Sequence, residues 1–359
     1  MDMMMILMLV GGLALLTLGG EFLVRGSSKL AALFGISPLV IGLTVVAFGT
    51  SSPELAVSVQ AGFGGNPDIA VGNVIGSNIF NVLLILGMCA VLVPLTVSMR
   101  LVRIEVPLMI AASVIFLLMG LDGRIGFLDG ALLFGALIVY LTWSIRAERR
   151  ESKARAEENG EEPIERGAKA VALNLGFVAA GLGLLVLGAD WLVTGAVAMA
   201  RDFGVSELVI GLTIVAAGTS LPEVAASIAA TIKGERDMAI GNVVGSNLFN
   251  ILCIIGLASM VTPGGLTVSD AALSFDMPVM IAVAVACLPI FFTGYTIYRW
   301  EGALFLASYV AYVLFLIFSA TQNPALETLS NALIITMPLV VIVLGWTTIQ
   351  AFRRGDHRL

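Results

Sequence analysis

One stretch of this sequence occurs twice, 169 residues apart, and each copy places a carboxylate inside an otherwise apolar run. The copies read AFGTSSPE at residues 47–54 and AAGTSLPE at residues 216–223, so they end in Glu54 and Glu223. An ionisable side chain is costly inside a membrane helix and marks a candidate functional site. Two such acids at matching positions predict a site that both halves of the chain build together.

The duplication extends well beyond this motif. Residues 18–87 align with residues 187–256 without a gap, and 32 of the 53 residues from Gly35 to Gly87 recur in the second half. Asn, Ser, Thr, Glu and Pro keep their register, which chance similarity between two apolar helices does not produce. The chain is therefore built from two related halves.

Composition places both halves in a membrane. The chain is 58% hydrophobic and 12% charged, which is about half the charged fraction of a soluble domain. Apolar runs of roughly 20 residues, the length that spans a bilayer as a helix, recur along the chain. We therefore predict an all-α polytopic membrane protein that is not an enzyme, because no nucleophile–base set is present. The expected spans are residues 4–31, 38–62, 68–92, 101–120, 126–147, 169–200, 207–232, 238–261, 271–293, 300–320 and 328–352.

Each half contains five of these spans. Because five is odd, the second half must enter the membrane in the opposite sense, which is the inverted-topology repeat of many secondary transporters. The eleventh span has no counterpart. The expected organisation is a first repeat at residues 1–147, a cytoplasmic linker at 148–168, a second repeat at 169–320, and an extra transmembrane helix with a basic cytoplasmic tail at 321–359.

Lysine and arginine set the orientation, because cytoplasmic loops carry an excess of them. With the N-terminus outside, 17 of these residues fall on the inner side, and only Arg124 and Arg201 fall outside. The C-terminus is then cytoplasmic. Asp2 precedes the first span and no basic segment does, so we expect that span to be retained rather than cleaved as a signal peptide.

The residues around each glutamate share one helix face. Five of them are spaced i, i+3, i+4, i+7 and i+11, which aligns their side chains on an α-helix. They are Ala47, Thr50, Ser51, Glu54 and Ser58 in the first copy and Ala216, Thr219, Ser220, Glu223 and Ser227 in the second.

A proline precedes each glutamate. Pro53 has no N–H group, so the carbonyl of Gly49 loses its helical partner, and Pro222 does the same to Gly218. Backbone carbonyls freed inside a membrane must find protein, water or an ion. Each face therefore offers a carboxylate, hydroxyls and free carbonyls together.

The next span of each half supplies a second wall. GNVIGSNIFN at residues 72–81 matches GNVVGSNLFN at residues 241–250. The glycines allow helices to approach closely, and polar residues at i, i+4 and i+8 form a single stripe. These stripes are Asn73, Ser77 and Asn81 in the first half and Asn242, Ser246 and Asn250 in the second.

All of these candidate ligands are oxygens. Such hard donors suit calcium, sodium and magnesium, and a loose mixture of carboxylates and carbonyls favours calcium over magnesium, which demands a tighter octahedron. The three cysteines have no metal-ligand spacing, and the single histidine, His357, lies in the tail. Each element alone would indicate only helix packing, whereas the duplicated set with both glutamates indicates a cation site.

Four further acids leave alternatives open. Glu21 and its counterpart Asp190 lie in apolar runs, where they either join the site or end a helix or pair with a nearby base such as Arg25. Glu105 and Asp276 lie near the ends of predicted spans, so we expect them at the membrane interface.

With these motifs, the sequence resembles the cation/calcium exchanger superfamily and, within it, the prokaryotic sodium/calcium exchangers. Gly-Thr-Ser-x-Pro-Glu and Gly-Asn-x-x-Gly-Ser-Asn-x-x-Asn, each present twice, carry the resemblance. It covers the first ten spans and implies four ion sites at mid-membrane. By position it implies calcium ligands at Glu54, Glu223 and the carbonyls of Thr50 and Thr219; sodium ligands at Ala47, Ser51, Ser77, Ala216, Ser220 and Ser246, shared with both glutamates; and Asn81 and Asn250 at the central site, with Asn73 and Asn242 around it.

The resemblance also implies electrogenic antiport by alternating access, with three sodium ions exchanged for one calcium ion. Relatives that carry potassium typically have aspartate where this chain has Asn250, so we expect potassium independence. The alternatives are a proton-coupled exchanger of calcium or another divalent cation and, from another class, a cation channel. We expect a multi-pass protein of a prokaryotic plasma (inner) membrane that needs no cofactor beyond the transported ions and binds no nucleic acid. The sequence leaves its oligomeric state open, and the resemblance implies that a monomer is sufficient for transport.

Overall fold

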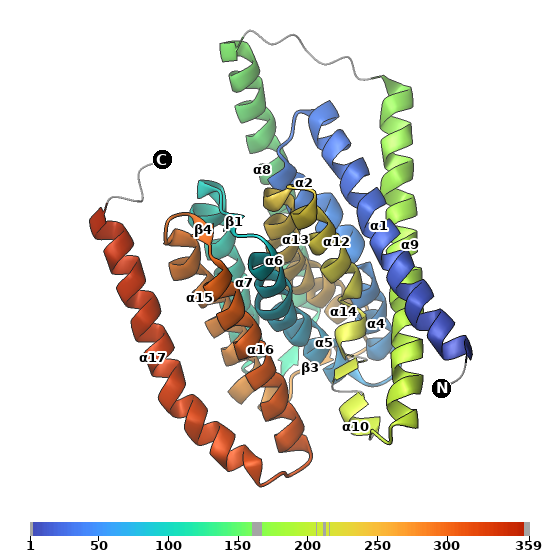
Figure 1. Ribbon diagram of the computed structural model, residues 1–359, viewed down its shortest axis with the longest axis vertical. Helices are drawn as coiled ribbons and strands as arrows, with labels where there is room; N and C mark the ends of the chain where they lie inside the picture. The colour runs from blue at the N-terminus through green and yellow to red at the C-terminus, as the bar shows by residue number, and fades with distance from the viewer. Residues whose placement is uncertain (1–2, 160–166, 206, 211–212, 215, 355–359) are drawn as a thin grey trace.

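The computed structural model describes residues 3–159, 167–205, 207–210, 213–214 and 216–354, and nearly all of them are helical (Figure 1). The first half contains α1 (Met3–Phe34), α2 (Pro38–Ile41), η1 (Gly42–Val46), α3 (Ala47–Thr50), α4 (Ser52–Phe63), α5 (Pro67–Phe80), η2 (Asn81–Leu86), α6 (Gly87–Leu92), η3 (Leu101–Glu105), α7 (Val106–Gly120) and α8 (Phe127–Asn159). The second half contains α9 (Ala168–Asp202), α10 (Glu207–Ile210), α11 (Ala216–Gly218), α12 (Leu221–Ile232), α13 (Arg236–Phe249), η5 (Asn250–Ile255), α14 (Gly256–Val261), η6 (Ala272–Asp276), α15 (Met277–Phe292) and α16 (Arg299–Ala320), and α17 (Ala325–Arg354) follows.

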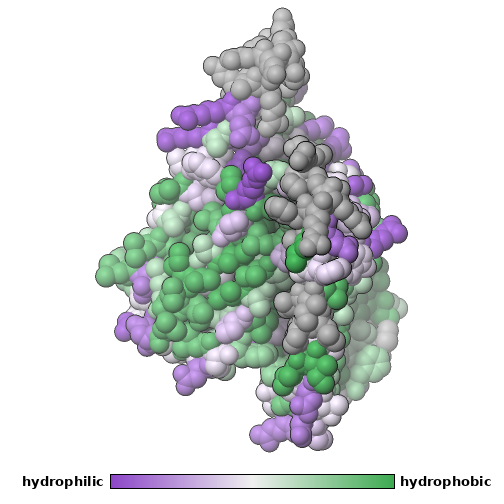
Figure 2. Space-filling model, turned by 90° about the vertical axis from the view of Figure 1, so that its left-hand side faces the viewer, coloured by the Kyte–Doolittle hydropathy of each residue, from purple (hydrophilic) through white to green (hydrophobic). Residues whose placement is uncertain are grey.

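The helices have the length and hydropathy of membrane spans. In the described part of the chain, eight helices are long and apolar enough to cross a bilayer, and the bent pair 38–50 and 52–63 makes nine. The predicted seventh span includes residues 211, 212 and 215, which lie outside the described residues, and the predicted eleventh lies within α17. Hydrophobic side chains form a broad belt on the face shown in Figure 2, and hydrophilic ones gather beyond its edges.

The first helices of the two halves, α1 and α9, pack side by side and antiparallel (Figure 1). A Cβ atom added at Gly12 would lie 2.9 Å from the carbonyl oxygen of Gly188, and one added at Gly19 would lie 2.9 Å from that of Gly181. The contact positions rise along α1 as they fall along α9. Equivalent helices of the two halves therefore run in opposite directions, which fits an inverted repeat.

Two short β-ladders also cross between the halves. Strand β1 (Leu95–Thr96) pairs antiparallel with β4 (Thr296–Ile297), and β2 (Arg124–Ile125) pairs antiparallel with β3 (Leu266–Thr267). Both β1 and β3 read Leu-Thr and follow the third helix of their half. Each half therefore contributes one strand to each ladder, as a two-fold arrangement requires.

The third helix of each half forms the core. In the span Arg236–Val261, which contains α13 and α14, 89% of the residues in its apolar stretch are buried. In the span Pro67–Leu92, which contains α5 and α6, the share is 78%. The other candidate spans bury 39% or less. The segments that carry the Gly-Asn-x-x-Gly-Ser-Asn motifs thus lie at the centre, and the remaining helices surround them.

The fifth helix is longer than predicted. We expected the membrane span to end at residue 147 and the linker after it to be a short surface helix or disordered, and α8 continues without a break to Asn159. The extension is rich in Ala, Glu, Arg and Lys, which are good helix formers outside a membrane as well. Residues 160–166 of the predicted linker lie outside the described residues.

Candidate functional site

The helices that carry the two glutamates are both interrupted at the residue after the Gly-Thr pair. The first breaks at Ser51, with φ −81° and ψ 6°, and the helical segments Pro38–Thr50 and Ser52–Phe63 meet there at an angle of 44°. The second breaks at Ser220, with φ −89° and ψ 5°. Because a proline at the second position of the new helix cannot donate to the preceding turn, the sequence itself sets both breaks, as predicted.

At these breaks each glutamate accepts a hydrogen bond from a serine of the opposite half. Ser220 Oγ donates to Glu54 Oε1 at 2.8 Å, and Ser51 Oγ donates to Glu223 Oε1 at 2.9 Å. Both carboxylates are 1% exposed. The two breaks therefore meet, and the paired acids that the sequence predicted lie in one buried site.

The other hydroxyls of the predicted set line the same region. Ser220 Oγ lies 3.3 Å from Ser77 Oγ, so the first half's stripe reaches the second half's break. Thr50 Oγ1 donates to Asn242 Oδ1 at 3.2 Å across the halves. Ser246 Oγ is buried with no hydrogen-bond partner among the described residues.

The outer asparagines of each stripe brace the glutamate-bearing helices. Asn73 Nδ2 donates to the Glu54 carbonyl at 3.2 Å and to Ser58 Oγ at 3.0 Å. Asn242 Nδ2 makes the equivalent bonds at 3.5 Å to the Glu223 carbonyl and at 2.9 Å to Ser227 Oγ. Each half thus ties its two site helices together with an amide.

Four asparagines form a second crossed set at the middle of the core. Asn81 Nδ2 donates to Asn247 Oδ1 at 3.0 Å, and Asn250 Nδ2 donates to Asn78 Oδ1 at 2.9 Å. Asn78 and Asn247 also donate to each other's carbonyl oxygens, at 3.4 and 3.3 Å. The amide nitrogens of Asn81 and Asn250 are engaged in these bonds. Their Oδ1 atoms have no hydrogen-bond partner in the described chain and are free to accept from or bind a ligand.

Asn78 and Asn247 were not among the predicted site residues. Both lie in the Gly-Ser-Asn motif, one position after the stripe serine, so helical spacing alone placed them on another face. Only the contact between the halves shows that they orient Asn81 and Asn250. A further unpredicted feature is that π-helical turns begin at Asn81 and Asn250, a form of helix that is frequent at functional sites.

Six buried oxygens of this region have no hydrogen-bond partner within the described chain, and all belong to the predicted set. Neither glutamate forms an ion pair with a described Lys or Arg, so their negative charge is not offset by protein. Carboxylate, amide and hydroxyl oxygens are the ligands of hard cations. The six atoms are Glu54 Oε2, Glu223 Oε2, Asn81 Oδ1, Asn250 Oδ1, Thr219 Oγ1 and Ser246 Oγ.

Comparison with known proteins identifies the family to which this arrangement belongs. Residues 4–146 and 173–318 match the family described as sodium/calcium exchanger protein. This chain is a member of the sodium/calcium exchanger family. The sequence-based resemblance is confirmed.

Individual relatives agree with this assignment. The chain is 33% identical over 345 residues to the sodium/calcium exchanger MaX1 of Methanosarcina acetivorans, with 87% of this chain and 98% of that one covered. It is 38% identical over 282 residues to the inner membrane protein YrbG of Escherichia coli, with 77% and 86% covered. A structure of the sodium-calcium exchanger NCX_Mj superimposes with a TM-score of 0.74 at 33% identity and covers 86% of this chain and 98% of its own.

Two predicted positions of this exchanger differ in their surroundings. Ala47 is fully buried beside the first break, whereas its counterpart Ala216 is exposed at the start of α11. Among the open alternatives, Glu21 and Asp190 are both exposed, and Glu21 lies 3.4 Å from Lys233 Nζ rather than pairing with Arg25. Neither acid takes part in the hydrogen bonds given above for the paired glutamates.

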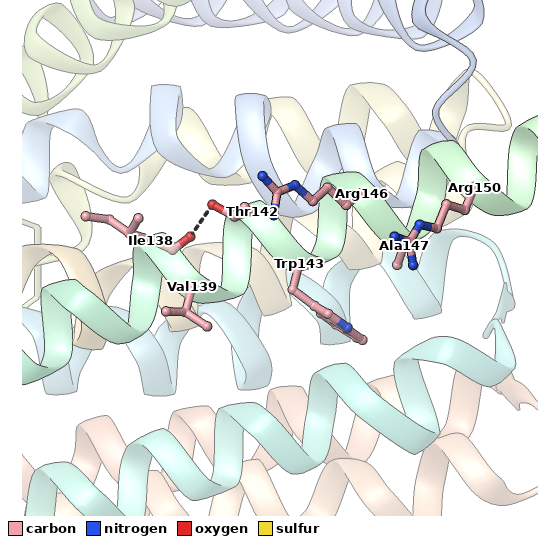
Figure 3. A pocket seen from close by; sticks show the side chains of 7 residues that line it. All are labelled: Ile138, Val139, Thr142, Trp143, Arg146, Ala147 and Arg150. Atoms are coloured by element: carbon pink, nitrogen blue, oxygen red, sulfur yellow. Dashed lines mark hydrogen bonds between the residues drawn. The ribbon is translucent and has the colours of Figure 1, made fainter.

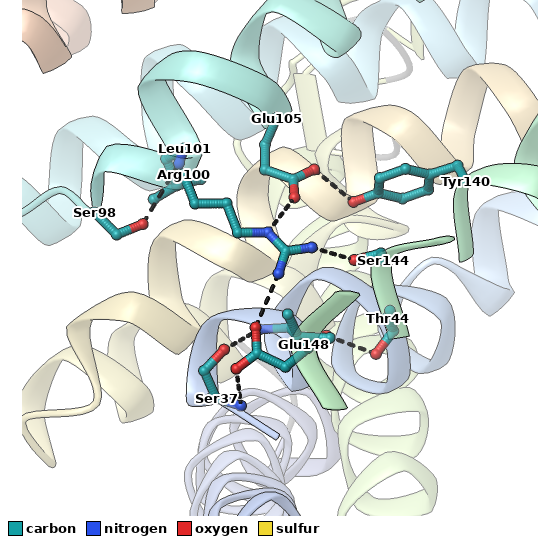
Figure 4. A network of polar contacts seen from close by, with 10 residues as sticks. Ser37, Thr44, Ser98, Arg100, Leu101, Glu105, Tyr140, Ser144 and Glu148 are labelled. Atoms are coloured by element: carbon teal, nitrogen blue, oxygen red, sulfur yellow. Dashed lines mark hydrogen bonds and ion pairs between the residues drawn. The ribbon is translucent and has the colours of Figure 1, made fainter. Parts of the chain in front are cut away.

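The acid Glu105, which we predicted at the membrane interface, has partners inside the protein. Glu105 is fully buried, where it binds Arg100 Nε at 2.9 Å and accepts from the Tyr140 hydroxyl at 2.7 Å (Figure 4). Arg100 also binds Glu148 at 2.9 Å and Ser144. Sequence position placed Glu105 near a helix end, but partners from α8 allow burial of the charge. In the second half, Asp276 is half-buried and only the tyrosine contact recurs, from Tyr312 at 3.1 Å.

Proposed function

We propose that this chain is a secondary antiporter that exchanges sodium for calcium at the paired glutamates. The observation that carries the proposal is the set of six unpartnered buried oxygens around Glu54 and Glu223. A protein interior rarely leaves buried acceptors unsatisfied, and a cluster of six around two acids is what a bound cation would complete. Their hardness and their uncompensated negative charge favour calcium and sodium as the transported substrates.

The residues divide into one central calcium site and flanking sodium sites. Calcium would bind Glu54, Glu223 and the carbonyls of Thr50 and Thr219, with Asn81 and Asn250 facing it. Sodium would bind on either side and share the glutamates. Because Ser77 lies beside Ser220 and Glu54, the flanking ligands are Ser77, Ala216 and Ser220 on one side. By the two-fold relation, Ala47, Ser51 and Ser246 lie beside Glu223 on the other. The hydrogen bonds between the halves support this shared arrangement.

The family resemblance implies three sodium ions per calcium ion, and the charge of the site then determines what that ratio means for voltage. Two carboxylates are neutralised by one calcium ion or by two sodium ions, so a third sodium leaves one net positive charge on the loaded carrier. Exchange is then electrogenic. Potassium is dispensable, because Asn250 is neutral and no third carboxylate is available to offset another cation. Equal sodium–calcium exchange in choline and potassium media is the expected result.

Unequal covering of the two glutamate helices supports alternating access. Helix α1 packs along α12, where a Cβ atom added at Gly20 would lie 2.9 Å from the Ala225 carbonyl oxygen. On the equivalent helix α4, Ala56, Val57 and Gln60 are exposed. The pair of α1 and α9 therefore packs on α12 and leaves the outer face of α4 free, while both glutamates stay buried. Movement of this pair from one glutamate helix toward the other would provide alternating access.

We further propose that the chain lies in a prokaryotic inner membrane with the N-terminus outside, on the lysine and arginine distribution. A cysteine that replaces Asp122 should react with an impermeant thiol reagent in intact cells. A cysteine that replaces Ala156 should react only after lysis. The reverse pattern would overturn the orientation.

Counterflow in proteoliposomes tests the antiport directly. An outward sodium gradient should drive radioactive calcium into the vesicles against its own gradient, and a sodium ionophore should abolish the uptake. Calcium that equilibrates without ever exceeding the external concentration would indicate a channel. Uphill uptake driven by a proton gradient in sodium-free medium would indicate proton coupling.

A further inference from the structure

An open groove of about 490 Å³ runs along the outward face of α8 (Figure 3). Its lining comes from this single helix, at positions spaced by about one turn. At one end lie the apolar Ile138 and Val139, which are 53% and 70% exposed. At the other end lie Arg146 and Arg150. The groove is therefore apolar along the membrane-spanning part of α8 and basic where that part ends.

The two arginines are available to a ligand. Both are exposed, and neither forms an ion pair or hydrogen bond with a residue in the described part of the chain. They are four residues apart, so their side chains project from the same face of the helix. Two guanidinium groups so placed can bind one phosphate through several charge-assisted hydrogen bonds.

Trp143 lies in the middle of the groove, and the Arg100 guanidinium packs against its ring. Its ring is 45% exposed, and the guanidinium carbon of Arg100 lies 5.8 Å from the ring centroid. Arg100 is itself fixed by Glu105 and Glu148. A tryptophan at this level is typical of the boundary between acyl chains and headgroups. Thr142 donates its hydroxyl to the Ile138 carbonyl at 2.7 Å, so this hydroxyl is already engaged within the helix.

The equivalent helix of the second half lacks this chemistry. Shared Gly-Ala-Leu sequences at residues 130–132 and 302–304 align α8 with α16. Phe318 and Gln322 then occupy the positions of Arg146 and Arg150. Because the halves are inverted, the basic groove exists at one membrane surface and has no twin at the other.

We propose that this groove binds an anionic glycerophospholipid. Its phosphate lies between Arg146 and Arg150, its glycerol region lies against Trp143, and one acyl chain follows Ile138 and Val139. The apolar half of the groove favours a lipid over a free phosphate ion, because an acyl chain contacts Ile138 and Val139 and a phosphate ion does not. The zwitterionic lipids of the same bilayer lack the net charge that the arginines select.

Quenching of Trp143 by brominated lipids tests the proposal. In a chain with Trp191, Trp300 and Trp346 replaced by phenylalanine, brominated phosphatidylglycerol should quench more strongly than brominated phosphatidylcholine at equal mole fraction. The ratio of the two association constants should fall about fivefold for each arginine replaced, in Arg146→Gln and Arg150→Gln, since each basic residue contributes about 1 kcal/mol to anionic-lipid attraction. The control Arg124→Gln, at the other end of α8, should leave the ratio unchanged.

Two further measurements distinguish a bound anionic lipid from a bound phosphate ion. Native mass spectrometry of the chain with all its tryptophans should show retained phosphatidylglycerol, which is lost from the double glutamine variant. Millimolar inorganic phosphate should not displace it. Equal quenching by the two lipids, a preference that survives loss of both arginines, or displacement by free phosphate would each overturn the proposal.

Discussion

Two repeat-equivalent regions beside the site differ in the space that they enclose. Next to the first break, Phe48 packs against Phe249 at a centroid distance of 5.7 Å, and the cavity there is about 10 Å³. Next to the second break, Ala217 stands in the place of Phe48, and a groove of about 370 Å³ remains beside Phe80 and Tyr309. The two differences between the motifs, Phe48 against Ala217 and Ser52 against Leu221, thus coincide with a large difference in packing.

This difference indicates where the site can open. A close-packed interior resists displacement, whereas free volume permits it. The segment around Ala217 has room to move toward Phe80, and the segment around Phe48 does not. The paired hydrogen bonds at the centre are symmetric, so we expect the two halves to be equal in ion binding and unequal in conformational change.

The largest expected effect tests the symmetric part. Glu54→Gln and Glu223→Gln should each weaken calcium binding more than about 100-fold, because an uncompensated buried charge costs about 3–5 kcal/mol. Calcium titration of the purified variants measures this. Asp190→Asn, at an exposed acid of α9, is the control and should bind normally. A variant that keeps wild-type affinity would show that the two acids do not share one ion.

A reciprocal exchange tests the asymmetric part. Ala217→Phe fills the larger groove and should slow turnover about 5- to 30-fold, if motion into that space then meets an overpacking cost of about 1–2 kcal/mol. Calcium affinity should be unchanged. Initial rates of sodium-driven calcium uptake measure the effect, and a wild-type rate would contradict the assignment of movement to this half.

Phe48→Ala is the matched change in the first half. It should leave turnover nearly unchanged but lower the free energy of unfolding by about 2 kcal/mol, roughly half the cost of removing a fully buried phenylalanine, because Phe48 is 52% exposed. Thermal unfolding followed by fluorescence measures the loss. A slowing as large as that of Ala217→Phe would remove the distinction between the halves.

The smallest expected effect concerns the crossed amides. Asn247→Leu removes the acceptor for Asn81 Nδ2 and should weaken calcium binding about fivefold, the value of about one hydrogen bond. Asn78→Leu should do the same to Asn250. Asn247→Asp keeps an acceptor and should bind better than Asn247→Leu. Equal loss in both variants of Asn247 would mean that the amide only fills space.

Much of this fold could be predicted because apolar runs and prolines act locally. The helix interruptions before Pro53 and Pro222 follow from a missing N–H group, and the duplicated motifs identified both walls of the site. The inverted arrangement followed from an odd number of spans in each half. These features need no knowledge of which helix packs against which.

The remainder depends on contacts between distant segments. Asn78 and Asn247 orient the central amides only because α5 and α13 cross, and Glu105 is buried only because Arg100 and Tyr140 lie beside it. The unequal grooves depend on what faces Phe48 and Ala217. No spacing within one helix reports such partners.

The voltage dependence of the calcium gradient at equilibrium tests the central charge count most directly. In proteoliposomes with a fixed sodium gradient and a potential clamped by potassium and valinomycin, the steady-state calcium ratio should change about 50-fold per 100 mV, since one net charge moved corresponds to about 2.3 kcal/mol. An inside-negative potential should lower internal calcium, whichever way the carrier is inserted. A ratio that does not respond to voltage would mean two sodium ions per calcium ion and would contradict a site in which three sodium ions replace one calcium ion at two glutamates.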